Sequence, residues 1–113
     1  MTTPHPALIA IDWGTSRLRA MLLGPDGGVV EERQSDDGIA SVPAGGHEAA
    51  FERLVAGWPA VPAIMAGMVG SRQGWREAAY APCPATPADL SLRLLRFETS
   101  SRRPVAIVPG VML

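Results

Sequence analysis

The stretch that decides the fold is LIAIDWGTSRLRAMLLG, residues 8–24. An apolar run leads to Asp12, a glycine-containing turn follows, and a second run then alternates apolar and polar residues. This pattern predicts two antiparallel strands, over about 7–13 and 17–24, joined by a tight turn. The hairpin would carry a carboxylate and several small hydrogen-bond donors at its tip, which is an arrangement that suits a phosphate bound together with a metal ion.

Composition narrows the class of protein. The chain has 113 residues, of which 47% are hydrophobic, and a formal net charge of −1. One domain of this size can bury a core, and its near-neutral charge gives no reason to expect nucleic acid or an anionic membrane as a partner. No apolar run approaches the ~20 residues of a membrane-spanning helix. All ten basic residues are arginine, so a Walker-type phosphate loop and lysine Schiff-base chemistry are excluded.

Cysteine usage and the chain ends carry further expectations. Cys83 is the single cysteine, which excludes an internal disulfide and fits a reducing compartment. The first residues lack the pattern of a secretory signal, so we expect a cytoplasmic protein. The last three residues are apolar and follow a predicted buried strand. We therefore expect the chain to be the first part of a longer protein, and a lobe without its partner to self-associate into a homo-oligomer.

Beyond the hairpin, the pattern predicts a mixed α/β layer. A turn at 25–28 and a third strand at 29–34 complete an antiparallel meander over 7–35. From His47 the apolar period becomes helical, with the sheet-facing stripe formed by Phe51, Leu54, Val55 and Trp58.

The second half of the chain is predicted to add helix–strand units. The expected elements are a buried strand at 61–66, a glycine-punctuated loop at 67–75, a helix start at Thr86 and a final buried strand at 105–108. Residues 90–99 fit either a helix or a strand. Two polar groups are expected at the solvated surface, namely His47 at its helix start and the strand-edge run 31–33.

The hairpin tip offers groups suited to a nucleotide phosphate. An aspartate at a strand end can hold Mg²⁺ through its water shell. Gly14 allows phosphate oxygens to approach the backbone, where the amides and hydroxyls of Thr15 and Ser16 can donate. Arg19 can reach an anion from the second strand. The alternative is that Asp12 and its neighbours only satisfy a turn beside solvated arginines.

The loop at 67–75 combines glycines with polar side chains. The spacing of Gly67, Gly70 and Gly74 is not that of a dinucleotide-binding fingerprint. The glycines suggest a backbone that lies close to a ligand, and a hydroxyl, an amide and an arginine could bind the hydroxyls and carboxylate of a sugar acid. The alternative is a surface loop with Trp75 packed beneath it.

Three segments resemble the 2-dehydro-3-deoxygalactonokinase family within the actin-like superfamily of sugar kinases and chaperone ATPases. They are IAIDWGTSRLRA at 9–20, MAGMVGSRQGW at 65–75 with YAPCP at 80–84 after it, and VAIVPG at 105–110. The middle segment is the most specific to the family. Arg17 departs from the small polar residue that is more usual, and Met21 departs from the more common tryptophan.

The resemblance implies that residues 1–113 form the N-terminal lobe of a ribonuclease-H-like, actin-like kinase whose second lobe is absent from this sequence. The reaction implied is ATP-dependent phosphorylation of 2-dehydro-3-deoxy-D-galactonate at its terminal hydroxyl, in galactonate breakdown. ATP, Mg²⁺ and the sugar acid would be the ligands. The alternatives are another actin-like carbohydrate kinase, or a non-catalytic lobe or gene fragment.

The resemblance also implies roles for individual residues. Asp12 would organise Mg²⁺, Gly14, Thr15 and Ser16 would hold the phosphates, and Arg19 would assist them. The acceptor pocket would be lined by Gly67, Met68, Gly70, Ser71, Arg72, Gln73 and Trp75. No general base is evident, because the family's catalytic aspartate would lie outside this chain. We therefore expect these residues alone to be inactive as a kinase.

Overall fold

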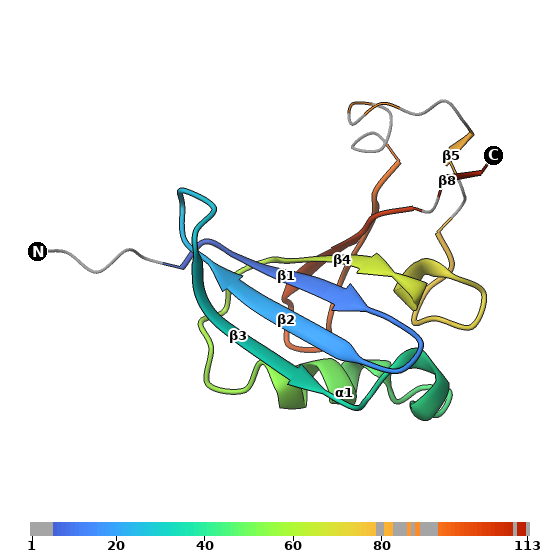
Figure 1. Cartoon of the computed structure of the whole chain (residues 1–113), viewed down its shortest axis with the longest axis horizontal. Helices are drawn as coiled ribbons and strands as arrows, with labels where there is room; N and C mark the ends of the chain where they lie inside the picture. Colours follow the sequence, from blue (N-terminus) through green and yellow to red (C-terminus); the bar gives the residue numbers. More distant parts are fainter. Residues whose placement is uncertain are drawn as a thin grey trace, which may run out of the picture.

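The computed structural model describes residues 6–78, 81–82, 86, 88, 93–109 and 111–112 (Figure 1). Within these residues, six strands form one mixed sheet in the order β3-β2-β1-β4-β7-β6. The strands are β1 (Leu8–Trp13), β2 (Leu18–Leu23), β3 (Val29–Ser35), β4 (Ala63–Gly67), β6 (Leu95–Glu98) and β7 (Pro104–Ile107). The helical elements are η1 (Ile39–Ser41), α1 (His47–Leu54) and η2 (Met68–Gly70). No helix in the described part of the chain is long and apolar enough to span a membrane.

The predicted meander is confirmed. Strand β2 pairs antiparallel with both β1 and β3, and the turn after β2 is closed by the Gly24 amide, which donates to Gly28 O at 2.9 Å. Period-two alternation places Ile9, Ile11 and Trp13 in the core. The intervening residues, including Asp12, therefore lie on the opposite face of the sheet.

Two further strands add parallel pairing to the sheet and make it the mixed sheet that the sequence predicted. Strand β4 pairs with β1, and β7 pairs with β4, both in parallel. The carboxyl ends of β1 and β4 therefore meet at one edge, where Trp13 stands opposite Gly67. Strand β4 begins later than the predicted residue 61, and it is buried on one face only, since Ile64 is half-buried and Ala66 is exposed.

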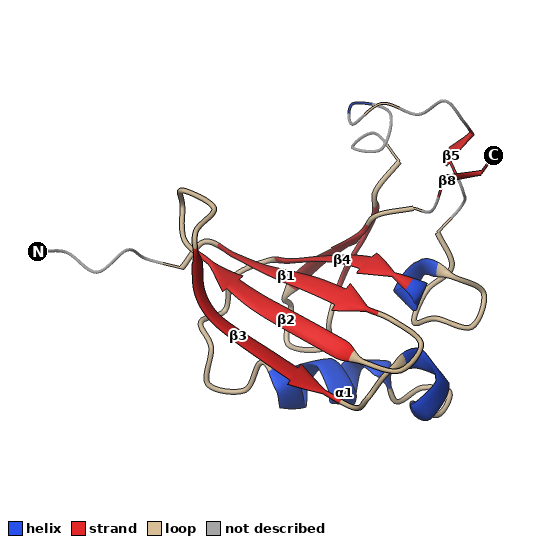
Figure 2. Cartoon of the chain, viewed as in Figure 1, coloured by secondary structure: helices blue, strands red, loops and turns tan. Residues whose placement is uncertain are grey.

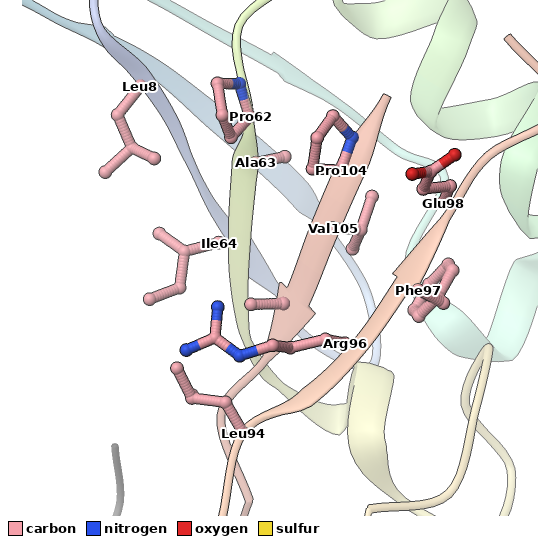
Figure 3. A pocket seen from close by; sticks show the side chains of 11 residues that line it. Leu8, Pro62, Ala63, Ile64, Leu94, Arg96, Phe97, Glu98, Pro104 and Val105 are labelled. Carbon is pink, nitrogen blue, oxygen red and sulfur yellow. The ribbon is translucent and has the colours of Figure 1, made fainter. Parts of the chain in front are cut away.

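The helix α1 lies against one face of the sheet (Figure 2). A hydrophobic core fills the space between the two. Its largest fully buried side chains include Trp13, Phe51 and Met65. The other face carries an apolar groove of about 460 Å³ over β1, β4, β7 and β6. Figure 3 shows Leu8 and Ile64 along this groove, with Arg96 crossing it. Arg96 and Glu98 are the charged residues among those that line the groove, and Asp12 is not part of its lining.

The structure settles part of the ambiguous segment 90–99. Residues 95–98 are the edge strand β6, antiparallel to β7. Leu90, Leu92 and Cys83 lie outside the described residues, as do Pro87 and Asp89 of the predicted helix start. The short parallel pair of β5 (Ala81–Pro82) and β8 (Val111–Met112) was not predicted, and β8 follows the strand predicted as the last.

Arg33 corrects the prediction of a wholly solvated edge at 31–33. Glu31 and Glu32 are exposed, as expected, but Arg33 is half-buried. Its Nη1 donates to Leu54 O at 3.0 Å and to Ala56 O at 2.8 Å. Because the last carbonyls of a helix have no partner within the helix, this guanidinium caps the carboxyl end of α1.

Candidate functional site

The hairpin tip between β1 and β2 is a turn whose backbone donors are only partly used. The Gly14 amide donates to Arg17 O at 2.9 Å and closes the turn, so it is not available to a ligand. Thr15 and Ser16 are exposed, and neither backbone amide donates to an acceptor within the described part of the chain. Two consecutive free amides in a turn form a concavity that suits an anion.

A second segment of chain fixes this tip from the side. The amide of Ile39 donates to Gly14 O at 2.9 Å, and that of Ala40 donates to Thr15 O at 3.0 Å. Gly38 lies so close to Thr15 and Ser16 that a Cβ there would collide with their backbone atoms. Its role in holding the tip depends on this long-range contact.

Asp12 lies in the row of the sheet that joins β2, β1 and β4. Its register partners are Arg19 on β2 and Ala66 on β4, and its side chain is exposed. Arg19 is already paired, since its Nη2 lies 2.8 Å from Glu32 Oε1. This hydrogen bond to Glu32, together with the charges of Glu32 and Asp12, raises the pKa of Arg19 above its ordinary value. Arg19 would have to leave Glu32 to contact a phosphate.

The donor set near Asp12 limits how a metal could be held. Within the described residues, no three His, Cys, Asp or Glu side chains gather into a metal site. Mg²⁺ commonly uses one or two carboxylates, several waters and substrate phosphates rather than an all-protein cage. The exposed carboxylate of Asp12 beside a turn with free amides fits that mode of binding.

Gly67, at the end of β4, connects the glycine loop to the hairpin. Its backbone φ is +100°, a conformation that residues with a side chain rarely adopt. A Cβ here would lie 2.6 Å from Trp13 O and 3.3 Å from Asp12 Oδ1. Gly67 is therefore required for the close approach of β4 to the end of β1.

The other glycines of the loop are also explained by packing within the chain. A Cβ on Gly70 would lie 2.9 Å from Ile107 Cγ2, and one on Gly74 would collide with the carbonyl oxygen of Val69. The hydroxyl of Ser71 closes the same loop by donating to Met68 O at 2.7 Å. These glycines therefore need no ligand to account for them. The exposed side chains that the loop leaves available are those of Met68, Arg72 and Gln73.

Trp75 anchors the loop to the core. It is half-buried, and its ring centroid lies 6.1 Å from that of Trp13, 6.1 Å from that of Phe51 and 5.1 Å from that of Phe97. The packing that was the alternative interpretation of Trp75 is thus present. Trp75 also lines a cavity beside α1, so packing and ligand contact are compatible for this residue.

His47 is buried, contrary to the prediction that it is solvated. Only 7% of the residue is exposed, and its ring centroid lies 5.9 Å from that of Trp13. Burial lowers the pKa of His47, so the imidazole is neutral at pH 7. Its Nε2 has no hydrogen-bond partner among the described residues. The sequence could not show this burial, because it is created by aromatic residues distant in the chain.

Comparison with known proteins identifies the family. A sequence model described as 2-keto-3-deoxy-galactonokinase matches residues 12–113, which include both the hairpin tip and the glycine loop. The chain belongs to the 2-keto-3-deoxy-galactonokinase family. The resemblance stated from the three sequence segments is thereby confirmed.

Members of this galactonokinase family with curated names extend the match. The chain is 36% identical over 105 residues to a 2-dehydro-3-deoxygalactonokinase of Rhizobium meliloti (strain 1021), covering 90% of this chain and 34% of that protein. It is 36% identical over 105 residues to the 2-dehydro-3-deoxygalactonokinase of Escherichia coli (strain K12), covering 91% of this chain and 34% of that protein.

A crystal structure described as a 2-dehydro-3-deoxygalactonokinase protein from Sinorhizobium meliloti shares the fold. It has a TM-score of 0.80 and 38% identity, covering 92% of this chain and 34% of that one. The mixed α/β sheet is therefore the fold of a family member. The chain spans about a third of the length of the relatives it matches.

Proposed function

We propose that this chain is the N-terminal, nucleotide-binding lobe of an actin-like kinase that phosphorylates 2-dehydro-3-deoxy-D-galactonate at its terminal hydroxyl. The observation that carries the proposal is the exposed carboxylate of Asp12 next to the free amides of Thr15 and Ser16. Membership of the galactonokinase family supports the acceptor. The reaction would belong to galactonate catabolism in the cytoplasm, where ATP is supplied.

The residues of the hairpin tip would hold the phosphates of ATP. Phosphoryl transfer depends mainly on positioning and on neutralising charge, which hydrogen-bond donors can provide without covalent chemistry. The amides and hydroxyls of Thr15 and Ser16 would donate to phosphate oxygens, while Gly14 keeps the turn compact. Asp12 would hold Mg²⁺, which supplies charge neutralisation and orientation of the phosphates when bound. Arg19 would assist after exchanging Glu32 for a phosphate.

The loop after β4 would supply the acceptor side. Arg72 and Gln73 are exposed polar side chains, which suit the carboxylate and hydroxyls of a sugar acid. Met68 would provide apolar contact at the mouth of the site, and Trp75 would hold the loop in place. A second lobe would have to contribute the general base, so we propose that the 113-residue chain alone does not turn over ATP.

Titration of the 113-residue chain with Mg·ATP, followed by amide NMR, tests the phosphate site. The largest changes in amide chemical shift should occur at Thr15 and Ser16. Asp12→Asn should weaken binding at least about tenfold, the equivalent of one charge-assisted interaction. Asp26→Asn is the matched control, because Asp26 is exposed in the turn after β2 and its Oδ1 only accepts the Gly28 amide.

Two results would contradict the proposal. Equal affinities for the Asp12→Asn variant and the parent chain would remove Asp12 from the site. Steady ATP turnover by the 113-residue chain, abolished by Asp12→Asn, would show that no second lobe is needed.

A further inference from the structure

The strand β6 forms one edge of the six-stranded sheet, and its outer side is unpaired in the part of the chain that the structure describes. Its sheet neighbour is β7, and no other described strand pairs with it. An edge strand presents a row of amides and carbonyls that a further strand can pair with. The residues along this edge decide which strand it could accept.

The hairpin between β6 and β7 shows which backbone groups of β6 point outward. The Thr99 amide donates to Arg103 O at 3.0 Å. Because bonded residues alternate along an antiparallel pair, the amide and carbonyl of Phe97 point toward β7, as those of Thr99 do. The amides and carbonyls of Arg96 and Glu98 therefore point away from the sheet, where no described strand pairs with them.

The two residues with outward backbone groups also carry opposite charges. Arg96 and Glu98 are both exposed, and they share the face of the sheet that carries the apolar groove, because they are two residues apart on one strand (Figure 3). Neither forms an ion pair with another described residue. The edge thus has an unpaired cation and an unpaired anion exactly where its backbone is open to a partner.

We propose that β6 pairs antiparallel with β6 of a second copy of this chain, about a two-fold axis that passes through Phe97. In this register Arg96 stands opposite Glu98 of the partner subunit, and Glu98 stands opposite the partner's Arg96. The outward amide and carbonyl of both residues then each find a backbone partner. The inference is independent of the proposed function.

Charge complementarity identifies a second copy as the occupant. A two-fold contact joins the same patch on both copies, so the patch must be complementary to itself. Opposite charges directly across an antiparallel pair stabilise it, and like charges destabilise it. Sliding the two strands by two residues would place Arg96 opposite the partner's Arg96, so the charges favour a single register.

Phe97 lies at the centre of the proposed pairing, on the other face of the sheet. Its ring is half-buried against the core and lies 5.1 Å from the ring centroid of Trp75. Side chains that stand opposite each other in an antiparallel pair have Cβ atoms about 5 Å apart, and aromatic pairs at such positions stabilise the two strands. The dimer would therefore bring the two Phe97 rings side by side while each stays packed on its own core.

Analytical ultracentrifugation of the 113-residue chain measures the proposed dimer, and amide hydrogen exchange locates it. We expect a monomer–dimer equilibrium that depends on protein concentration. The amides of Arg96 and Glu98 should exchange more slowly as the concentration rises, because each becomes hydrogen-bonded only in the dimer. The amide of Phe97, which already faces β7 in the single chain, is the internal reference.

Charge reversal tests the register. Arg96→Glu places like charges opposite each other and should raise the dissociation constant at least about tenfold, and Glu98→Arg should do the same. A mixture of these two single variants should form a heterodimer, and the variant with both changes should dimerise like the parent chain. Arg53→Glu is the matched control, because Arg53 is exposed on α1, away from β6, and should leave the dissociation constant unchanged.

Three results would overturn the proposal. The first is a chain that stays monomeric up to the highest concentration used for hydrogen exchange. The second is exchange at Arg96 and Glu98 that does not depend on concentration. The third is a dimer that Arg96→Glu leaves intact, since this would place the contact elsewhere on the chain.

Discussion

Gly38→Ala should distort the hairpin tip between β1 and β2, although residue 38 is not one of the proposed ligand contacts. The backbone of Gly38 has φ −61° and ψ 165°, which alanine adopts without strain. The effect must therefore come from the new Cβ, which would meet the backbone of Thr15 and Ser16 at a separation that real Cβ atoms essentially never show. The atoms that the Cβ would meet belong to the backbone and cannot turn aside as a flexible side chain can. Either the segment 38–40 or the hairpin tip therefore has to move.

The cost can be worked from the contacts that are lost. Moving the segment breaks the bonds from Ile39 and Ala40 to the hairpin carbonyls, each worth about 1 kcal/mol, and overpacking itself typically costs 1–3 kcal/mol. We expect the free energy of unfolding to fall by about 3–5 kcal/mol, and Tm by roughly 12–20 °C. Urea and thermal unfolding measure this loss. Amide NMR should show the Thr15 and Ser16 resonances displaced, with Mg·ATP binding weakened.

Gly28→Ala is the matched control, because a Cβ there meets only the flexible carboxylate of Asp26, at 3.2 Å. It should change Tm little and leave the hairpin resonances in place. Equal Tm values for the Gly38 and Gly28 variants, with unshifted Thr15 and Ser16 amides, would refute the idea that Gly38 positions the turn.

Three other substitutions test the packing around the site. Burial lowers the pKa of His47 below 6.5 in the folded chain, so the unfolded chain binds the proton more readily. The free energy of unfolding should therefore fall as the pH drops below 6.5. Urea unfolding at several pH values should show that this free energy depends less on pH in the His47→Phe variant. Arg33→Met removes two hydrogen bonds to the end of α1 and should lower the free energy of unfolding by about 2 kcal/mol, while a loss under half of that would argue against a cap. Trp75→Ala should lower the free energy of unfolding by about 3 kcal/mol, measured by thermal unfolding, because the ring contacts with Trp13 and Phe97 are lost. Trp75→Phe should restore most of that free energy.

The meander and α1 could be predicted because their signals are local. Alternation over Ile9, Ile11 and Trp13 gives the buried face of β1. Helical spacing of Phe51 and Val55 gives the buried side of α1 and of its C-cap residue. Segment 95–98 could not be assigned, because an edge strand with Phe97 packed on Trp75 shows the same short apolar pattern as a helix. The hairpin tip was predicted for the same local reason as the strands on either side of it.

The roles of single polar residues and glycines were harder to predict, because they depend on partners distant in the chain. His47 is buried through contact with Trp13, and Arg33 is half-buried because α1 ends beside it. The glycines of the loop were interpreted as allowing a ligand to approach, whereas Gly67 and Gly74 make room for the chain itself. A sequence shows that a Cβ is missing, but it does not show what occupies the space.

The free amides at the hairpin tip belong to a turn that the segment 38–40 holds in place through the turn's own carbonyls. In an ordinary tight turn, the carbonyl of Gly14 would accept a hydrogen bond from within the turn. Here the amides of Ile39 and Ala40 donate hydrogen bonds to the carbonyl oxygens of Gly14 and Thr15 instead. The amides of Thr15 and Ser16 are the two central amides of the turn and have no acceptor within it, so they face solvent, which a phosphate oxygen can replace without breaking any bond within the chain. Anion binding at this turn should therefore be lost when the segment 38–40 is displaced, even with every residue of the turn intact.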